Sequence, residues 1–213
     1  ITPDFLTIIE VNDCSEQVKG FDLSNVKMIV EPYTNTAFYK IKTKQKILFP
    51  TDPSHANNCW AKLVGMDISE YKSKGTVSYA SLVVAKNMGF SIIILVGQDL
   101  AYANNQCYSK DSPYSELVFE INPQTGRPEF KIRDYEKYIK ALFKVNLDTE
   151  QPYYREFADE KVKTLNSTLY FVKGISGEMI PTQACYATFI EHFREFAYLN
   201  KDLKLINSSM IGA

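Results

Sequence analysis

The segment from residue 75 to residue 100 constrains the fold of this chain more than any other part. Small and apolar residues recur at helical spacing in its first half: Val77, Ala80, Ser81, Val84 and Met88. Gly89 then marks a helix end, and the apolar run 92–96 predicts a buried strand. A helix that leads directly into a buried strand is typical of α/β proteins.

Other short apolar runs predict further strands, at 5–11, 28–30 and 47–49. Asn or Pro residues follow each run, and the near absence of polar residues within them indicates parallel strands buried on both faces. Short helices are expected between the strands, at 35–44 and 52–64. Their candidate N-caps are Thr34 for the first, and Asp52 or Ser54 for the second.

The second half of the chain begins with a polar stretch at about 104–131, rich in Asn, Pro and Gly and too long for an ordinary connection. We interpret it as a mobile lid or an insertion. Amphipathic helices are expected at 132–145 and 150–165, a strand at 169–172 and a glycine turn at 174–177.

A long helix is expected after Thr182, its candidate cap, and a last strand at 203–206. The apolar face of the helix has six members: Tyr186, Phe189, Ile190, Phe193, Phe196 and Ala197. Strands and helices therefore alternate along the chain. This order predicts one layered α/β domain over residues 1–213, with a mostly parallel central sheet.

Charge and composition exclude several classes of function. Lys and Arg (24) nearly cancel Asp and Glu (25), and no basic block occurs, so a nucleic-acid or membrane-surface role is disfavoured. The longest apolar run, 90–96, is interrupted by a serine and is far shorter than the ~20 residues of a membrane-spanning helix. The four cysteines lack C-x-x-C spacing, which favours free thiols in a reducing cytoplasm.

The opening of the helix that follows Gly75 is a candidate phosphate site. A helix N-terminus offers unpaired backbone N–H groups and a partial positive charge, and Thr76 and Ser78 add two hydroxyls. The alternative is that Thr76 or Ser78 only caps the helix while Gly75 relieves a turn.

Gly97, Gln98 and Asp99 come directly after the predicted strand 92–96, where open α/β sheets bind their ligands. Asp99 is suited to accept a sugar hydroxyl, to take a proton from a nucleophile or to bind a metal. Asp13 follows the first strand in the same way and faces the same crevice if the two strands are neighbours. For both acids the alternative is a turn-capping role.

The two histidines give little support for catalysis. His192 lies among phenylalanines in the long helix, and His55 lies in a loop-like segment without a motif around it. The sequence has no Ser/His/Asp elbow, H-E-x-x-H helix, P-loop or complete G-x-G-x-x-G. Hydrolase, metalloprotease and dehydrogenase interpretations therefore lose their support.

Three motifs, taken together and in order, resemble the central domain of the motility accessory factor (Maf) family, bacterial proteins that glycosylate flagellin. They are Gly75-Thr76-Val77-Ser78, Met88-Gly89-Phe90, and Ile93 to Tyr102 with the letters IILVGQDLAY. Further agreement comes from Thr2 to Phe5, Gly174 to Thr182, Ile206-Asn207 and Gly212-Ala213. The resemblance spans almost the whole chain.

This resemblance implies a Rossmann-like glycosyltransferase domain, sialyltransferase-like in architecture. Such a domain transfers a nonulosonic sugar, of the pseudaminic or legionaminic acid type, from its CMP donor to Ser or Thr of flagellin in the cytoplasm. Two departures stand out. The Gly-rich strand-turn of the family would precede Ile1, so we expect a fragment, and Gln106 to Ser109 stand where the family often carries a histidine.

The resemblance also assigns roles to the candidate residues. Gly75, Thr76 and Ser78 would hold the phosphate, Gln98 and Asp99 would orient the ribose or sugar or supply the base, and Tyr102 would donate to the leaving phosphate. Gly97 and Asp13 are further candidates for binding the donor. No metal or other cofactor is expected, because a CMP-sugar carries a single phosphate. No nucleic acid or membrane partner is expected either.

Two other functions stay open. Archaeal pterin pyrophosphokinases resemble the same domain, and such an enzyme would transfer a diphosphate from ATP to a pterin alcohol with Mg²⁺. Alternatively, the domain only binds flagellin or an assembly factor as a scaffold, for which an exposed apolar patch would be the sign.

Overall fold

The computed structural model describes residues 2–49, 63, 65, 74–102, 107, 115–143 and 152–209. The chain divides into two compact units. The N-terminal unit holds Ile1–Ile93 and Asn200–Lys204, and the C-terminal unit holds Ile94–Leu199 and Leu205–Ala213. None of the described helices is long and apolar enough to cross a bilayer. That the units form one domain stays a prediction.

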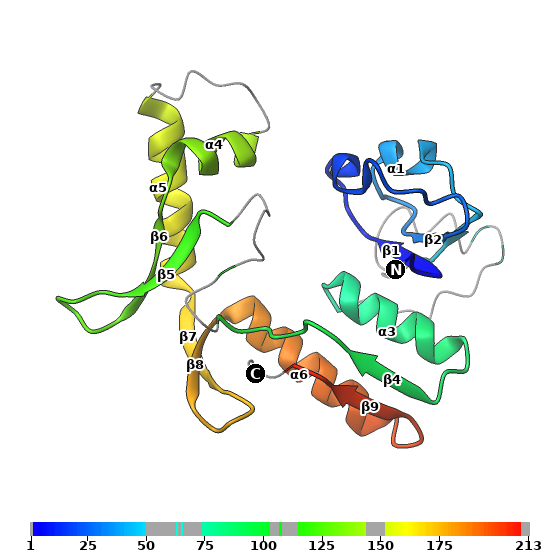
Figure 1. The fold of residues 1–213 in the computed structure, drawn as a ribbon. Helices are drawn as coiled ribbons and strands as arrows, with labels where there is room; N and C mark the ends of the chain where they lie inside the picture. The colour runs from blue at the N-terminus through cyan, green and yellow to red at the C-terminus, as the bar shows by residue number, and fades with distance from the viewer. Residues whose placement is uncertain are drawn as a thin grey trace. The chain divides into compact units, whose positions relative to one another are not determined.

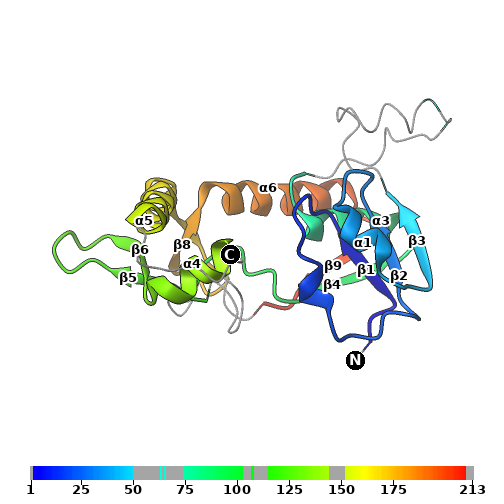
Figure 2. The ribbon, with the colours of Figure 1, turned by 90° about the horizontal axis from the view of Figure 1, so that it is seen from above.

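The N-terminal unit is built on a three-stranded parallel sheet (Figures 1 and 2). Its strands are β1 (Phe5–Ile8), β2 (Lys27–Val30) and β3 (Gln45–Leu48), in the order β1-β2-β3. All three were expected from apolar runs, and their parallel direction is confirmed. The predicted burial on both faces holds best for β2, where Met28, Ile29 and Val30 are buried, because β2 alone has a neighbour on each side.

Short helical segments connect these strands: η1 (Ser15–Val18) and α1 (Thr36–Lys40). The predicted cap of α1 was wrong by one residue, because Asn35 Oδ1 accepts from the N–H of Ala37 (3.0 Å). Thr34 is buried, and its hydroxyl donates to the carbonyl of Ile8 (3.2 Å). The helix predicted at 52–64 and its caps lie outside the described residues, apart from Leu63.

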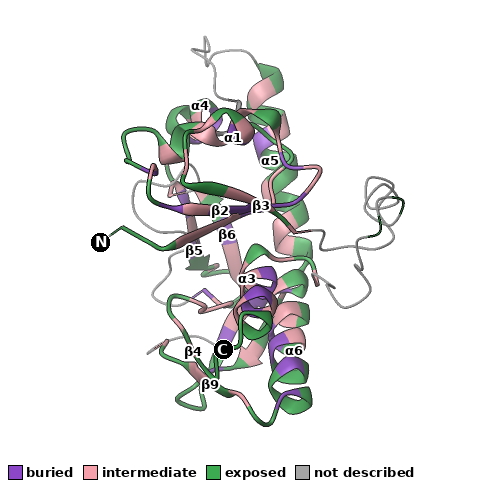
Figure 3. Ribbon diagram, turned by 90° about the vertical axis from the view of Figure 1, so that its right-hand side faces the viewer, coloured by how far each residue is buried: buried purple, intermediate pink, exposed green. Residues whose placement is uncertain are grey.

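The helix predicted after Gly75 is confirmed as α3 (Val77–Asn87). Tyr79, Ala80, Leu82 and Val84 are its buried residues, and the helix contacts β1. Figure 3 shows buried residues, in purple, along α3. Gly89 follows with φ +86°, the left-handed conformation in which helices commonly end.

The predicted strand after α3 is β4 (Ile92–Leu95), and it pairs with β9 (Lys204–Asn207). The N–H of Lys204 donates to Ser91 and the N–H of Ser208 to Leu95, so the hydrogen bonds advance in the same direction on both strands, which are parallel. The prediction of a fully buried strand was wrong. Ile92 (57%), Ile94 (58%) and Val96 (77%) are exposed, because alternate side chains of a strand point to opposite faces and only the other face is covered.

The C-terminal unit has its own core, around a hairpin of β5 (Leu117–Ile121) and β6 (Pro128–Ile132) and the helices α4 (Tyr135–Phe143) and α5 (Pro152–Ser167). The buried cluster comprises Tyr102, Leu117, Phe119, Phe130, Tyr138, Ile139 and Ala158. The described end of the stretch expected to be a lid is thus an ordered hairpin. Residues 103–106 and 108–114 lie outside the described part, and the lid interpretation stays a prediction for them.

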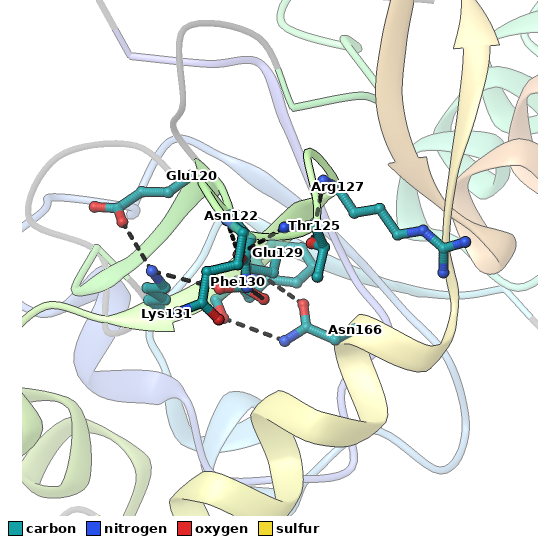
Figure 4. Close-up of polar contacts among 9 residues, drawn as sticks. Glu120, Asn122, Thr125, Arg127, Glu129, Phe130, Lys131 and Asn166 are labelled. Carbon is teal, nitrogen blue, oxygen red and sulfur yellow. Dashed lines mark hydrogen bonds and ion pairs between the residues drawn. The ribbon is translucent and has the colours of Figure 1, made fainter.

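Polar contacts fix the hairpin turn and its attachment to α5 (Figure 4). Asn122 Oδ1 accepts from the N–H groups of Gln124 (2.8 Å) and Thr125 (3.2 Å). Asn166 of α5 accepts from the N–H of Phe130 (2.6 Å) and donates to its carbonyl (3.2 Å). The amide of Asn166 therefore takes the place of a neighbouring strand at this position of β6.

The glycine turn at 174–177 belongs to a second antiparallel hairpin, of β7 (Leu169–Lys173) and β8 (Met179–Gln183). The predicted strand and glycine turn are confirmed, whereas β8 was not predicted and Thr182 as the cap of the last helix was wrong. Thr182 lies within β8, and its hydroxyl donates to the carbonyl of Leu100 (2.7 Å). The helix itself, α6 (Ala184–Leu199), is confirmed, and it buries Ile190, Phe193 and Phe196.

Candidate functional site

The eight residues predicted for the site divide between the two units. Asp13, Gly75, Thr76 and Ser78 belong to the N-terminal unit, and Gly97, Gln98, Asp99 and Tyr102 to the C-terminal unit. Each group has its own geometry. That the two groups face one groove stays a prediction.

The N-terminus of α3 has the properties expected of a phosphate site. Gly75 is exposed at φ +83°, a left-handed conformation that glycine adopts without strain. Thr76 is extended and its carbonyl accepts from Ala80 (3.1 Å), but its side chain makes no capping hydrogen bond. Thr76 therefore holds the N-cap position, as the capping alternative predicts, but without a side-chain hydrogen bond, and the positive φ of Gly75 agrees with its predicted role in the turn. Helix geometry leaves the N–H groups of the first turn, including those of Val77 and Ser78, without intrahelical acceptors.

Asp13 has the turn-capping role that the sequence left as its alternative. Its Oδ1 accepts from the N–H (3.1 Å) and the hydroxyl (2.6 Å) of Ser15, the first residue of η1. The carboxylate is exposed, beyond the end of β1. A role in ligand binding stays a prediction for Asp13.

Gly97, Gln98 and Asp99 begin a tightly bent segment after β4. Gly97 lies at φ +69°, and Leu100 lies at φ +49°, the left-handed region that is unusual for a residue with a side chain. A backbone of this kind costs about 1–3 kcal/mol and persists where its surroundings hold it. Here Thr182 donates to the carbonyl of Leu100, and the N–H of Tyr102 donates to Pro181 (2.8 Å), so β8 holds the segment in place.

Asp99 is half-buried within this segment. In the part of the chain that the structure describes, its carboxylate takes part in no hydrogen bond or ion pair, so a turn-capping role has no support there. Among the same residues, no three His, Cys, Asp or Glu side chains gather as a metal site.

Tyr102 is part of the core. It is 5% exposed, its ring stacks on Phe119 and meets Phe130 edge to face, and its hydroxyl donates to Gln183 Oε1 (2.7 Å). Tyr102 and Gln183 also line a cavity of about 460 Å³, together with Leu117, Tyr138, Phe157, Glu160, Lys161, Thr164 and Leu165. A role of the hydroxyl toward a leaving phosphate stays a prediction.

A second cavity, of about 240 Å³, brings together residues that the sequence analysis did not connect. Gln98 lines it, with Arg194 of α6 and Asn207 of β9. The apolar members of the lining are Leu95, Leu100, Ile190, Phe193, Ala197 and Leu205. Asn207 follows the predicted strand 203–206 just as Gln98 follows 92–96, so the same reasoning identifies it. Arg194 gives no such signal, because arginines are common on the polar side of an amphipathic helix.

A family model described as "6-hydroxymethylpterin diphosphokinase MptE-like" matches residues 1–105. This range holds all eight predicted site residues, whereas Arg194 and Asn207 lie beyond it. No match was found among curated proteins or among solved structures.

Proposed function

We propose that this chain is a nucleotide-dependent transferase, and that it moves a nonulosonic sugar from a CMP donor to Ser or Thr of flagellin. The observation that carries the proposal is the N-terminus of α3, which is exposed, follows a left-handed glycine and has no cap from Thr76. Such an end favours a phosphate. Similarity of residues 1–105 to a family named for a diphosphokinase supports the handling of phosphate compounds.

The chemistry is displacement of CMP through a transition state with oxocarbenium character. The acceptor hydroxyl must lose a proton, and the leaving phosphate must be stabilised as its charge develops. We assign the proton to Asp99 and the phosphate to the N–H groups that follow Gly75, with Ser78 beside them. Gln98 orients the ribose or sugar. A CMP-sugar has one phosphate, so the reaction needs no metal in this proposal.

A second function is favoured by the activity for which the matched family is named, 6-hydroxymethylpterin diphosphokinase. This reaction moves a diphosphate from ATP to the hydroxymethyl group of a pterin and releases AMP. It would use the same helix N-terminus, together with Mg²⁺.

One experiment separates the two functions. The purified protein is incubated either with a CMP-nonulosonic acid and flagellin, or with ATP, Mg²⁺ and 6-hydroxymethyl-7,8-dihydropterin. A gain of one sugar mass per modified site on flagellin supports the glycosyltransferase; pterin diphosphate and AMP support the diphosphokinase instead. If the protein binds flagellin but turns over neither donor, the result supports the non-enzymatic scaffold function instead of both reactions.

Asp99 provides the test of the mechanism. We expect Asp99→Ala and the near-isosteric Asp99→Asn to abolish transfer, because neither can take a proton from the acceptor hydroxyl. The fold should be retained, since the carboxylate makes no hydrogen bond or ion pair with the described residues. The rate of transfer is measured as the gain in mass of flagellin that is unmodified at the start. Transfer at the wild-type rate in either variant would remove Asp99 from the mechanism.

The helix N-terminus has a separate test. Saturating CMP should slow amide hydrogen exchange at residues 75–80, because a bound phosphate accepts from N–H groups that otherwise face water. Exchange at 135–143, in α4, is the internal reference. Equal exchange at 75–80 with and without CMP would reject the phosphate assignment.

A further inference from the structure

The larger cavity, of about 460 Å³, belongs to the C-terminal unit and has a buried floor. Four of its lining residues are buried: Tyr102, Leu117, Tyr138 and Gln183. Two of the four are aromatic and one is aliphatic, so the floor is mainly apolar. The volume falls within the range of about 300–1,000 Å³ that is usual for small-molecule sites. The cavity is therefore large enough for a ligand with one ring.

One face of α5 forms the opposite wall. Its five lining residues follow the spacing i, i+3, i+4, i+7 and i+8, which places them on one side of the helix: Phe157, Glu160, Lys161, Thr164 and Leu165. A helix face that only packs against a core is apolar. Here three of the five side chains are polar and exposed, and they mark the open side of the cavity.

Gln183 supplies a hydrogen-bond donor at the floor. Its side chain is 7% exposed, and its Oε1 accepts from the hydroxyl of Tyr102 (2.7 Å). An amide nitrogen carries two N–H donors, yet Nε2 of Gln183 makes no hydrogen bond with the residues that the structure describes. Buried polar groups are normally satisfied. The floor therefore has a donor for an acceptor atom of a ligand.

Two opposite charges flank the open side. Lys161 Nζ lies 5.7 Å from the ring centroid of Phe157, so the ammonium stays beside an aromatic wall. Glu160 precedes Lys161 in α5 and lines the same cavity. Over the described ranges, neither side chain forms an ion pair. The open side thus presents a negative and a positive group to the same ligand.

We propose that this cavity binds an aromatic α-amino acid with a phenolic hydroxyl, of which tyrosine is the simplest. The ring of the ligand lies between Tyr138 and Phe157, since aromatic rings pack favourably on one another. Its phenolic oxygen accepts from Nε2 of Gln183. Its α-ammonium faces Glu160 and its α-carboxylate faces Lys161, so each charged end meets the opposite charge.

Binding of an amino acid here is independent of the proposed sugar transfer. It uses neither the helix N-terminus after Gly75 nor the side chains of Gln98 and Asp99. Tyr102 contributes its ring to the floor, and its hydroxyl remains on Oε1 of Gln183. Amino-acid binding can therefore fail without affecting the transferase proposal, and the reverse also holds.

The test is a ligand-observed NMR titration of the full chain with L-tyrosine and three analogues. L-tyrosine should bind most tightly. L-phenylalanine should bind about tenfold more weakly, because it gives Nε2 of Gln183 no acceptor. Tyramine lacks the carboxylate and phloretate lacks the ammonium, so each should bind about fivefold more weakly than L-tyrosine.

Two substitutions separate the charged contacts. Lys161→Gln should weaken L-tyrosine and phloretate about fivefold and leave tyramine unchanged. Glu160→Gln should weaken L-tyrosine and tyramine by a similar factor and leave phloretate unchanged. Both side chains are exposed, so both variants should fold. The matched controls, Lys163→Gln and Glu156→Gln, remove exposed charges of α5 that do not line the cavity, and should bind all four compounds like wild type.

Three results would overturn the inference. The first is that wild-type protein binds none of the four compounds. The second is equal affinity for L-tyrosine and L-phenylalanine, which would leave the floor donor without a role. The third is that Lys161→Gln and Glu160→Gln bind all four compounds like the two controls, which would place the ligand elsewhere.

Discussion

The hydroxyl of Tyr102 has a structural role in the core, and it is also the group proposed to donate to the leaving phosphate. Its partner, Gln183 Oε1, is on β8, and both side chains line the 460 Å³ cavity. A buried polar pair of this kind is stable because each group satisfies the other. The pair also connects the segment after β4 to the hairpin that holds it.

Tyr102→Phe should lower the free energy of unfolding by about 1–3 kcal/mol, because it leaves a buried carbonyl oxygen without its donor. Chemical denaturation measures the change. The same variant tests catalysis. Loss of sugar transfer under conditions where the variant is folded supports the phosphate role, and full transfer assigns Tyr102 to the core alone.

The thiol of Cys107 is predicted to be unreactive. Burial in apolar surroundings raises its pKa from 9.0 to about 12, so the thiol stays protonated at neutral pH. Iodoacetamide at pH 8, followed by peptide mass analysis, should label the exposed Cys185 well before Cys107. Equal labelling of both cysteines would contradict the half-buried position of Cys107.

The same shift predicts a dependence of stability on pH. The neutral thiol is favoured in the folded state, so its contribution is fully present below about pH 9. It declines as the pH rises toward 12, because the unfolded chain loses this proton first. Cys107→Ser, measured against wild type between pH 8 and pH 11, should reduce the slope of stability against pH.

At the scale of the elements, Asn166 is the clearest anchor. Its amide binds both backbone groups of Phe130 on the outer edge of β6. Asn166→Ala should cost about 1–3 kcal/mol of unfolding free energy, because the N–H and carbonyl of Phe130 lose their partner. Asn35→Ala is the comparison at a helix cap, where about 0.5–2 kcal/mol is expected. An unchanged unfolding midpoint in Asn166→Ala would mean that water replaces the two hydrogen bonds of Asn166 with no loss of stability.

Local patterns predicted the elements whose signal lies within a few residues. The three strands of the sheet, α3 and its end at Gly89 came from apolar runs, helical spacing and a glycine. The two hairpins were missed, because the pairing of β7 with β8 depends on register and on the turn, which a pattern of single residues does not contain. Thr182 was assigned to the wrong element for the same reason.

The candidate site was predictable to the same extent. A residue that directly follows a predicted strand can be selected as a site candidate from its place in the sequence alone. This reasoning selected Gln98, and it applies equally to Asn207. Arg194 needed three-dimensional information, because only the packing of α6 against the strand ends brings it to the cavity. The exposure of Ile92 and Ile94 also could not be predicted, since an apolar run does not specify which of its two faces is covered.

For the molecule as a whole, the matched range 1–105 differs from the compact units. It stops inside the C-terminal unit and omits β9, the partner of β4. A fragment of residues 1–105 should therefore lose protection from amide hydrogen exchange at 92–95. It should also aggregate more than the full chain, because the edge of β4 is unpaired, and light scattering measures this. Full protection at 92–95 in the fragment would contradict the pairing with β9.

The pairing of β4 with β9 also has a consequence during synthesis. A ribosome has to produce more than a hundred further residues after β4 before β9 emerges, so the edge of β4 that pairs with β9 stays unpaired during that interval. Premature termination anywhere in that interval leaves the edge open permanently. The nascent chain is thus most dependent on chaperones in the period when its most apolar strand is already made and its partner is not.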